Sequence, residues 1–170
     1  MVNFRFRSVG QILMALRHHG RDDVLIENSG MRRDNSAMGG PDRNETVILL
    51  AEDEPAVRNL VRTMLCQSGY AVLTANDGAE ALAICEAFAK EIHLLLTDAT
   101  MPLMDGLTVA AVVRSKRPGI KVIIMSGNTI ETIRAQNRPD AFLRKPFIPP
   151  TLLDCVQRVL ASKGPIDCEH

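Results

Sequence analysis

Residues 93–106 read His-Leu-Leu-Leu-Thr-Asp-Ala-Thr-Met-Pro-Leu-Met-Asp-Gly. The continuous apolar run is typical of a strand buried on both faces of a parallel sheet, and it stops at Asp98 before a turn that carries proline and glycine. Asp98 is therefore expected at the carboxyl end of a central strand, where open α/β sheets bind their ligands. An aspartate after a strand is also a common turn former or helix cap, so the other strand ends must decide between the two interpretations.

Length and composition limit the class of protein. The chain has 170 residues, 46% hydrophobic content and zero formal net charge, which suits one ordinary domain with an appendage. No basic block with interleaved aromatics points to nucleic acid, and no apolar run approaches the roughly 18 to 20 residues of a membrane span. The four cysteines lie far apart, without metal-ligand spacing. We expect Cys66, Cys85 and Cys155 to be small apolar fillers of helix faces and Cys168 to lie in a tail, in a reducing cytoplasm.

The first 44 residues differ from the rest of the chain. They show no sustained hydrophobic period, and Gly39-Gly40-Pro41 is a linker signal. We expect residues 1–44 to form a flexible or loosely docked extension, with a short docking helix for a partner as the alternative. The domain itself is expected over residues 45–163, followed by a C-terminal tail over residues 164–170.

From Thr46 onward, short apolar runs alternate with helical segments. Strands are predicted over residues 47–51, 70–74, 94–98, 120–125 and 140–143. Helices are predicted over residues 55–66, 79–89, 106–117 and 129–135, and from residue 150 to the Gly164-Pro165 stop. This alternation predicts an α/β domain with a doubly wound, five-stranded parallel sheet and helices on both faces. In the flavodoxin-like strand order 2-1-3-4-5, the first and third strands are neighbours.

Four of the predicted strands end in polar side chains, which are Glu52 with Asp53, then Asp98, Ser126 and Lys145. If the first and third strands are neighbours, three carboxylates meet and repel one another unless a cation joins them. Hard oxygen ligands in small number suit Mg²⁺. Lys145 brings a positive charge suited to a phosphate oxygen, and Ser126 brings a hydroxyl donor.

Together these groups predict a phosphoryl-transfer site. Asp98 is expected to attack phosphorus as a carboxylate nucleophile and become an aspartyl phosphate, while Mg²⁺ and Lys145 neutralise charge on the transferring oxygens. Each residue alone has an ordinary explanation, such as a helix cap for Asp53, a turn for Ser126 and a solvated charge for Lys145. Their joint occurrence at the right strand ends favours the functional interpretation.

Four segments resemble the receiver (phosphoacceptor) domain of bacterial two-component response regulators, over about residues 45–162. They are Ile48-Leu49-Leu50-Ala51-Glu52-Asp53-Glu54-Pro55, Leu96-Thr97-Asp98 through Met101-Pro102-Leu103-Met104-Asp105-Gly106, Val122-Ile123-Ile124-Met125-Ser126-Gly127 and Phe142-Leu143-Arg144-Lys145-Pro146-Phe147. The resemblance implies that Asp98 accepts phosphate from a phosphohistidine on a sensor histidine kinase or histidine phosphotransfer protein.

The same resemblance implies specific roles for other residues. Glu52, Asp53, Asp98 and the backbone carbonyl of Thr100 would hold Mg²⁺. The Ser126 hydroxyl would move toward the phosphate, with Phe142 following inward as the second member of a switch pair. It also implies a cis bond between Lys145 and Pro146, which proline permits.

Three features depart from the usual pattern of the family. Glu52 replaces the more usual aspartate, which keeps the charge but adds a methylene. Thr100 is neutral at a position that could tune the lifetime of the acyl phosphate. The segment between Ser126 and Lys145 is compact, with Asn137-Arg138-Pro139 where the family often has an Ala-Gly turn.

We therefore expect a cytoplasmic signalling switch: a single receiver without an attached output domain, which acts by binding an unidentified downstream protein. It would perform only its own phosphorylation and dephosphorylation and would not be an enzyme in the ordinary sense. A homodimer and an origin in a hybrid kinase stay open. The alternatives are a pseudo-receiver adaptor that takes no phosphate and, less favoured, a phosphatase of the haloacid dehalogenase type, for which Thr100 cannot serve as the general acid. An FMN site is disfavoured as well, because the acidic residues after the first strand would repel the phosphate of FMN.

Overall fold

The computed structural model describes residues 46–127 and 139–168. In these residues a parallel sheet has the order β2-β1-β3-β4-β5. The strands are β1 (Val47–Ala51), β2 (Ala71–Ala75), β3 (Leu94–Asp98), β4 (Lys121–Ser126) and β5 (Ala141–Arg144). The helices described are α2 (Pro55–Gln67), α3 (Gly78–Ala87), α4 (Gly106–Lys116) and α5 (Pro149–Ala161). The predicted flavodoxin-like, doubly wound α/β fold and its strand order are confirmed.

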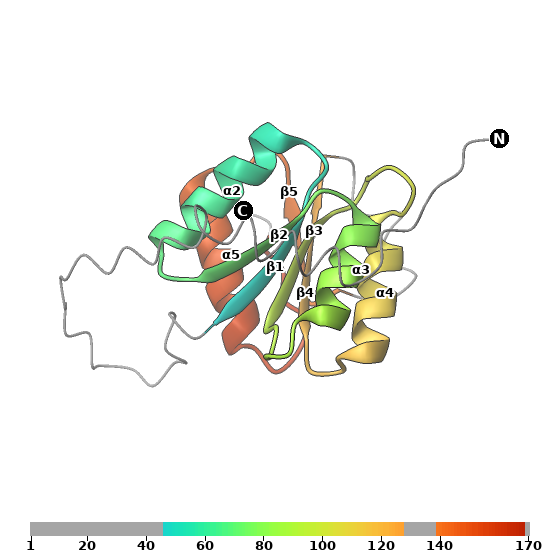
Figure 1. The fold of residues 1–170 in the computed structure, drawn as a ribbon. Coiled ribbons are helices and arrows are strands. Elements are labelled where there is room, and N and C mark those ends of the chain that lie inside the picture. The colour runs from blue at the N-terminus through green and yellow to red at the C-terminus, as the bar shows by residue number, and fades with distance from the viewer. Residues whose placement is uncertain (1–45, 128–138, 169–170) are drawn as a thin grey trace, which may run out of the picture. The chain divides into compact units, whose positions relative to one another are not determined.

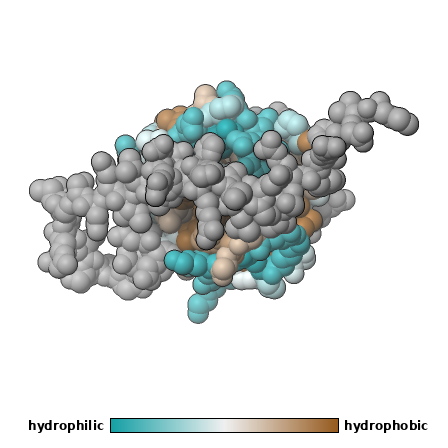
Figure 2. Space-filling model, viewed as in Figure 1, coloured by the Kyte–Doolittle hydropathy of each residue, from teal (hydrophilic) through white to brown (hydrophobic). Residues whose placement is uncertain are grey.

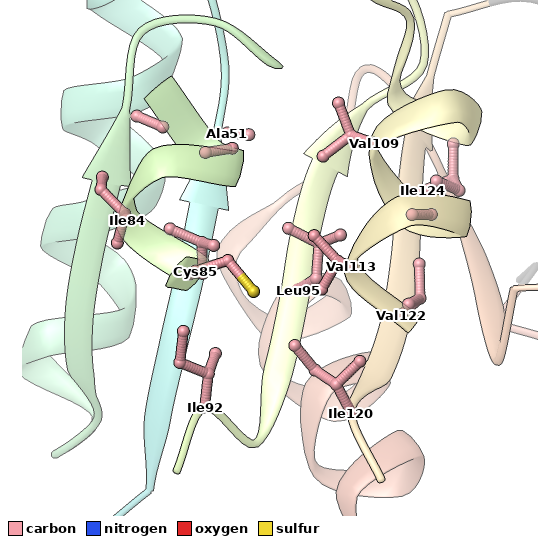
Figure 3. Close-up of a cluster of buried hydrophobic side chains, with 14 of the residues drawn as sticks. Ala51, Ile84, Cys85, Ile92, Leu95, Val109, Val113, Ile120, Val122 and Ile124 are labelled. Carbon is pink, nitrogen blue, oxygen red and sulfur yellow. The ribbon is translucent and has the colours of Figure 1, made fainter. Parts of the chain in front are cut away.

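Helices cover both faces of the sheet. Figure 1 shows α2 and α5 on one side of it and α3 and α4 on the other. Because successive strand residues point to opposite faces, Leu95 packs with the α3/α4 side, whereas Leu94 and Leu96 pack with the α2/α5 side. Figure 3 shows Cys85 of α3 and Val113 of α4 close to Leu95 of β3. The continuous apolar runs of the strands thus contribute side chains to a hydrophobic core on each face of the sheet.

Local sequence signals explain where the helices begin. Asp77 and Asp105 are the N-caps of α3 and α4, and their carboxylates accept hydrogen bonds from the backbone N–H groups of Glu80 and Thr108, both at 2.8 Å. α2 and α5 instead begin with proline in the first turn. Most predicted boundaries of strands and helices lie within one or two residues of those observed. The helix predicted over residues 129–135 lies outside the described residues.

The visible surface of the described part is largely polar. In the view of Figure 2, hydrophilic residues dominate the coloured surface and hydrophobic ones form small patches. The large hydrophobic side chains that are most exposed are Leu60, Leu103 and Ile148. Among the described residues, no helix has the length and apolar character that crossing a membrane requires.

Two of the expectations for the cysteines are wrong. Cys66 lies on the exposed face of α2, while Cys85 is buried as predicted. Cys155 is buried in the α2/α5-side core, but it is joined to Cys168 in a disulfide. The chain turns back after Ala161, so a tail residue reaches the middle of α5. Cysteine spacing alone does not reveal such a turn.

Candidate functional site

The carboxyl ends of β1 and β3 bring three acidic residues together. Glu52 directly follows β1, Asp53 comes next, and Asp98 is the last residue of β3. One carboxylate oxygen from each of the three lies within 4.8 Å of the others. Glu52 and Asp98 are buried, whereas Asp53 is exposed. The convergence predicted from strand order is therefore present.

Lys145 bridges the two buried carboxylates. Its Nζ lies 2.7 Å from Glu52 Oε2 and 2.6 Å from Asp98 Oδ1. The residue follows β5, which lies two strands away from β3 in the sheet, and its backbone N–H donates to the Ser126 carbonyl at 2.7 Å. That bond fixes the backbone from which the ammonium reaches across the site. The cis peptide expected between Lys145 and Pro146 is present.

Burial and charge act on the pKa values of this pair in opposite senses. Burial raises the pKa of Glu52, and the neighbouring charge of Asp98 adds to the rise, although the Lys145 ammonium opposes it. Burial works to lower the pKa of Lys145, but its hydrogen bonds to Asp98 and Glu52 outweigh that effect and leave it above the usual value. Lys145 is therefore a firmly protonated counter-ion for two carboxylates.

The loop after β3 orients the Asp98 side chain. The backbone N–H of Thr100 donates to Asp98 Oδ2 at 2.9 Å, while Lys145 holds Oδ1. Met104 N–H then bonds to the Pro102 carbonyl at 2.8 Å, which makes a γ-turn centred on Leu103, whose φ is 70°. A leucine in this conformation is strained, and the strain lies in the loop that carries the reactive carboxylate.

Ser126 and Phe142 lie on neighbouring strands. Ser126 ends β4 and is buried, and Phe142 in β5 packs into the α3/α4-side core. In the register of this strand pair, Ile124 lies opposite Phe142 and Ser126 opposite Arg144. The hydroxyl and the ring therefore come from adjacent strands. Their role as a switch pair stays a prediction.

Sequence reasoning missed one charged residue beside the acidic cluster. Arg58 in the first turn of α2 donates through Nη1 to the backbone carbonyls of Glu52, at 2.6 Å, and Asp53, at 3.3 Å. Its guanidinium thus ties down the backbone of both acids. The sequence held a signal for this contact, because an arginine one turn inside a helix can reach back to an acidic strand end that precedes the helix. Helix periodicity, however, does not distinguish such an arginine from one that is simply solvated.

Close approach of α4 to the site depends on Gly106. A Cβ on this residue would overlap the backbone oxygen of Asp98 and stand 3.0 Å from Thr97 Oγ1. The glycine N–H donates to the Ala99 carbonyl at 3.1 Å. The first residue of α4 is therefore pressed against the end of β3, and any larger side chain would displace one of them.

The donor set fits Mg²⁺. Three carboxylates offer hard oxygen ligands, and the exposure of Asp53 leaves room for the waters that this ion retains. The role of the Thr100 carbonyl as a further ligand stays a prediction.

Comparison with known proteins points to one family. The sequence model of the family described as response regulator receiver domain matches residues 48–157. The chain is 41% identical over 120 residues to the sensor kinase CckA of Brucella abortus, which covers 68% of this chain but 13% of that protein. It is 31% identical over 126 residues to the transcriptional regulatory protein GlrR of Escherichia coli, which covers 72% of this chain and 28% of that one. The chain thus spans a minor part of these relatives.

Solved structures agree with that match. The receiver domain of the hybrid histidine kinase CckA superposes with a TM-score of 0.58 at 38% identity, covering 67% of this chain and 98% of that one. A receiver protein from Sinorhizobium medicae gives a TM-score of 0.64 at 28% identity, covering 69% and 95%. The response regulator TrrA of Thermotoga maritima, solved in complex with Mg²⁺-BeF, gives 0.60 at 30% identity, covering 67% and 98%.

Proposed function

Because the chain belongs to the response regulator receiver domain family, we propose that it is a phosphorylation-dependent switch that accepts a phosphoryl group on Asp98. Receiver domains are signalling domains of two-component systems rather than ordinary enzymes. The observation that carries the proposal is the bridge from Lys145 to Asp98 beside Glu52 and Asp53. This arrangement supports the proposal because it brings the proposed nucleophile, a cation and three carboxylates that could hold a divalent metal to the same ends of the strands.

In the proposed transfer, an Asp98 carboxylate oxygen bonds to phosphorus as the bond from phosphorus to a donor histidine nitrogen breaks, and that nitrogen keeps the electron pair. Mg²⁺ held by Glu52, Asp53, Asp98 and the Thr100 carbonyl would neutralise charge on the phosphoryl oxygens. Lys145 already contacts Asp98 Oδ1, so its ammonium would contact the transferred group with little rearrangement. The Thr100 N–H keeps the carboxylate oriented.

The output is proposed to run through Ser126 and Phe142. The hydroxyl would move toward the new phosphate, and the ring would follow into the space it leaves. The two residues lie on adjacent strands, two register positions apart, and both are buried, which supports this pairing. A preference of a few kcal/mol between two arrangements is sufficient for a signalling switch.

The phosphodonor is proposed to be a sensor histidine kinase or a histidine phosphotransfer protein, and the output an unidentified protein partner. Similarity to the receiver of a hybrid kinase supports the class of donor. We place the protein in the cytoplasm, where such donors present their phosphohistidine, and a phosphorylation-dependent homodimer is one form that the output could take.

Intact-mass measurement tests the proposal. The full chain is incubated with Mg²⁺ and a small phosphodonor such as acetyl phosphate, and it should gain the mass of one phosphoryl group. Asp98→Asn should gain nothing. Asp105→Asn is the matched control, since the new asparagine still caps α4, and it should be phosphorylated like the parent.

An unchanged mass of the folded parent protein would overturn the proposal and favour the pseudo-receiver alternative. Phosphorylation of Asp98→Asn to the parent level would overturn the assignment of the acceptor.

A further inference from the structure

The C-terminal tail folds back on the domain. Beyond α5, the N–H of Ile166 donates to the Asp140 carbonyl at 2.7 Å, just before β5 begins. Arg158 Nη2 in α5 donates to the Asp167 carbonyl at 2.9 Å. The Ile166 side chain packs against the α2/α5-side core. Residues 164–168 therefore lie against α5 and the start of β5, which is an edge strand of the described sheet.

A disulfide fastens this tail. Cys168 is joined to Cys155 in the middle of α5, thirteen residues earlier, with the Cα atoms 5.5 Å apart, an ordinary separation for such a bond. Cys155 is fully buried, and Cys168 is 7% exposed. The other attachments of this segment, which include the hydrogen bonds of Ile166 and Asp167 and the partly buried Ile166 side chain, are non-covalent, so the disulfide is its one covalent link among the described residues.

The bond lies beside an open cavity. Cys168 helps to line a cavity of about 570 Å³, together with Lys145, Phe147 and Ile148. A small thiol that enters this cavity meets Cys168 before it meets Cys155. The same cavity has Lys145 in its wall, so the position of the tail affects the surroundings of a residue of the acidic site.

We propose that Cys155 and Cys168 form a reversible thiol–disulfide site that fastens the tail when oxidised and releases it when reduced. A dithiol reductant attacks Sγ of Cys168 as a thiolate, forming a mixed disulfide and expelling the Cys155 thiolate, which takes a proton. The second thiol of the reductant then displaces Cys168. The protein gains two electrons and two protons, and the reductant becomes a disulfide.

Cellular redox conditions determine whether the bond between Cys155 and Cys168 is formed. In reducing compartments, protein disulfides are usually transient and act in catalysis or sensing. The pair is therefore a device by which oxidation fastens the tail over the β5–α5 side of the domain. This inference does not depend on phosphorylation of Asp98, so either can fail without the other.

Counting thiols tests the bond. The full chain is equilibrated with oxidised or reduced dithiothreitol, alkylated under denaturing conditions with N-ethylmaleimide and weighed intact. The oxidised sample should gain the mass of two labels, as expected for the free thiols of Cys66 and Cys85, and the reduced sample the mass of four. Labels on all four residues in the oxidised sample, or failure of dithiothreitol to reduce the folded protein, would overturn the proposal.

Hydrogen exchange tests release of the tail. The backbone amides of Gly164 and of residues 166–168 should exchange at least about tenfold faster in the reduced than in the oxidised protein. Cys168→Ser should match the reduced parent in either buffer, whereas the control Cys66→Ser should still respond to reduction. Equal exchange in oxidised parent, reduced parent and Cys168→Ser would show that the bond does not hold the tail.

Discussion

Lys145 is the residue on which the charge balance of the site depends. It neutralises two buried carboxylates that come from different strands. Replacing it with methionine would leave Glu52 and Asp98 close together without the ammonium that neutralises them. Since the lysine side chain is 23% exposed, solvent reduces the cost, and we expect Lys145→Met to lower the free energy of unfolding by about 1–2 kcal/mol at neutral pH without Mg²⁺.

The difference in unfolding free energy between parent and Lys145→Met should depend on pH, because the lysine affects the pKa of Glu52. Burial raises the pKa of Glu52 above its ordinary value of 4.5, and the lysine keeps it lower than it would be in the variant. The contribution of the lysine is therefore full where Glu52 is ionised in both proteins, and it disappears as pH falls through the raised pKa of Glu52, above 4.5. Urea titrations at several pH values should show the gap between parent and variant closing in acid. Lys116→Met, which breaks an exposed pair with Glu86, is the control, and an equal loss in both variants would contradict the account.

Arg58 gives a test in which charge and position predict opposite results. Arg58→Gln removes a positive charge near the acidic cluster, and this alone would strengthen Mg²⁺ binding. Because the guanidinium holds the backbone of Glu52 and Asp53, we expect binding about tenfold weaker instead. Calorimetric titration measures it, with Arg62→Gln, one turn along α2, as the charge control. If Arg58→Gln binds Mg²⁺ as tightly as the parent, Arg58 does not position the metal-binding residues.

At the scale of elements, the start of α4 can lie against the end of β3 only because Gly106 has no side chain. Alanine is a better helix former than glycine by about 1 kcal/mol, yet its Cβ would overlap the Asp98 backbone. We expect Gly106→Ala to destabilise the protein by about 2 kcal/mol in thermal or urea unfolding. Gly119→Ala, whose Cβ would meet nothing within 4 Å, should be nearly neutral. An unchanged or raised stability of Gly106→Ala would contradict the close approach.

Most elements could be predicted from the sequence because their signals are local. Continuous apolar runs marked the buried strands, and prolines or aspartate caps marked the helix starts. The buried face of α3 was harder to predict, since this helix is apolar nearly all round. Ala81 and Ile84 are buried, whereas the larger Leu82 is only partly buried against the same core. Which side of such a helix faces the sheet depends on tertiary packing, and periodicity does not encode it.

At the scale of the whole molecule, Asp140 ties separate parts of the chain together. Its carboxylate pairs with Arg114 of α4 at 2.5 Å and with Lys121 of β4 at 3.3 Å, and it accepts from the Val122 N–H at 2.8 Å. Asp140→Asn keeps the shape but loses the charge, and we expect about 1–2 kcal/mol less stability. Asp154→Asn, on an exposed pair with Arg158, should change stability by less than about 0.5 kcal/mol. Similar values for the two variants would contradict this role.

The convergence of Glu52, Asp98 and Lys145 was predictable because parallel strands end at one edge and strand order decides which ends are neighbours. The bridging contact of Lys145, the reach of Arg58 and the return of Cys168 to α5 were not. Each depends on the path of a long side chain or an irregular segment, which only the folded backbone determines.

The central claim is that this edge makes Asp98 the phosphoacceptor. Borohydride reduction converts an aspartyl phosphate to homoserine, and peptide mapping then locates it. After treatment with acetyl phosphate and Mg²⁺, we predict homoserine at position 98, and none when Mg²⁺ is removed by chelation. Homoserine at another aspartate, or none anywhere in folded protein, would contradict the account.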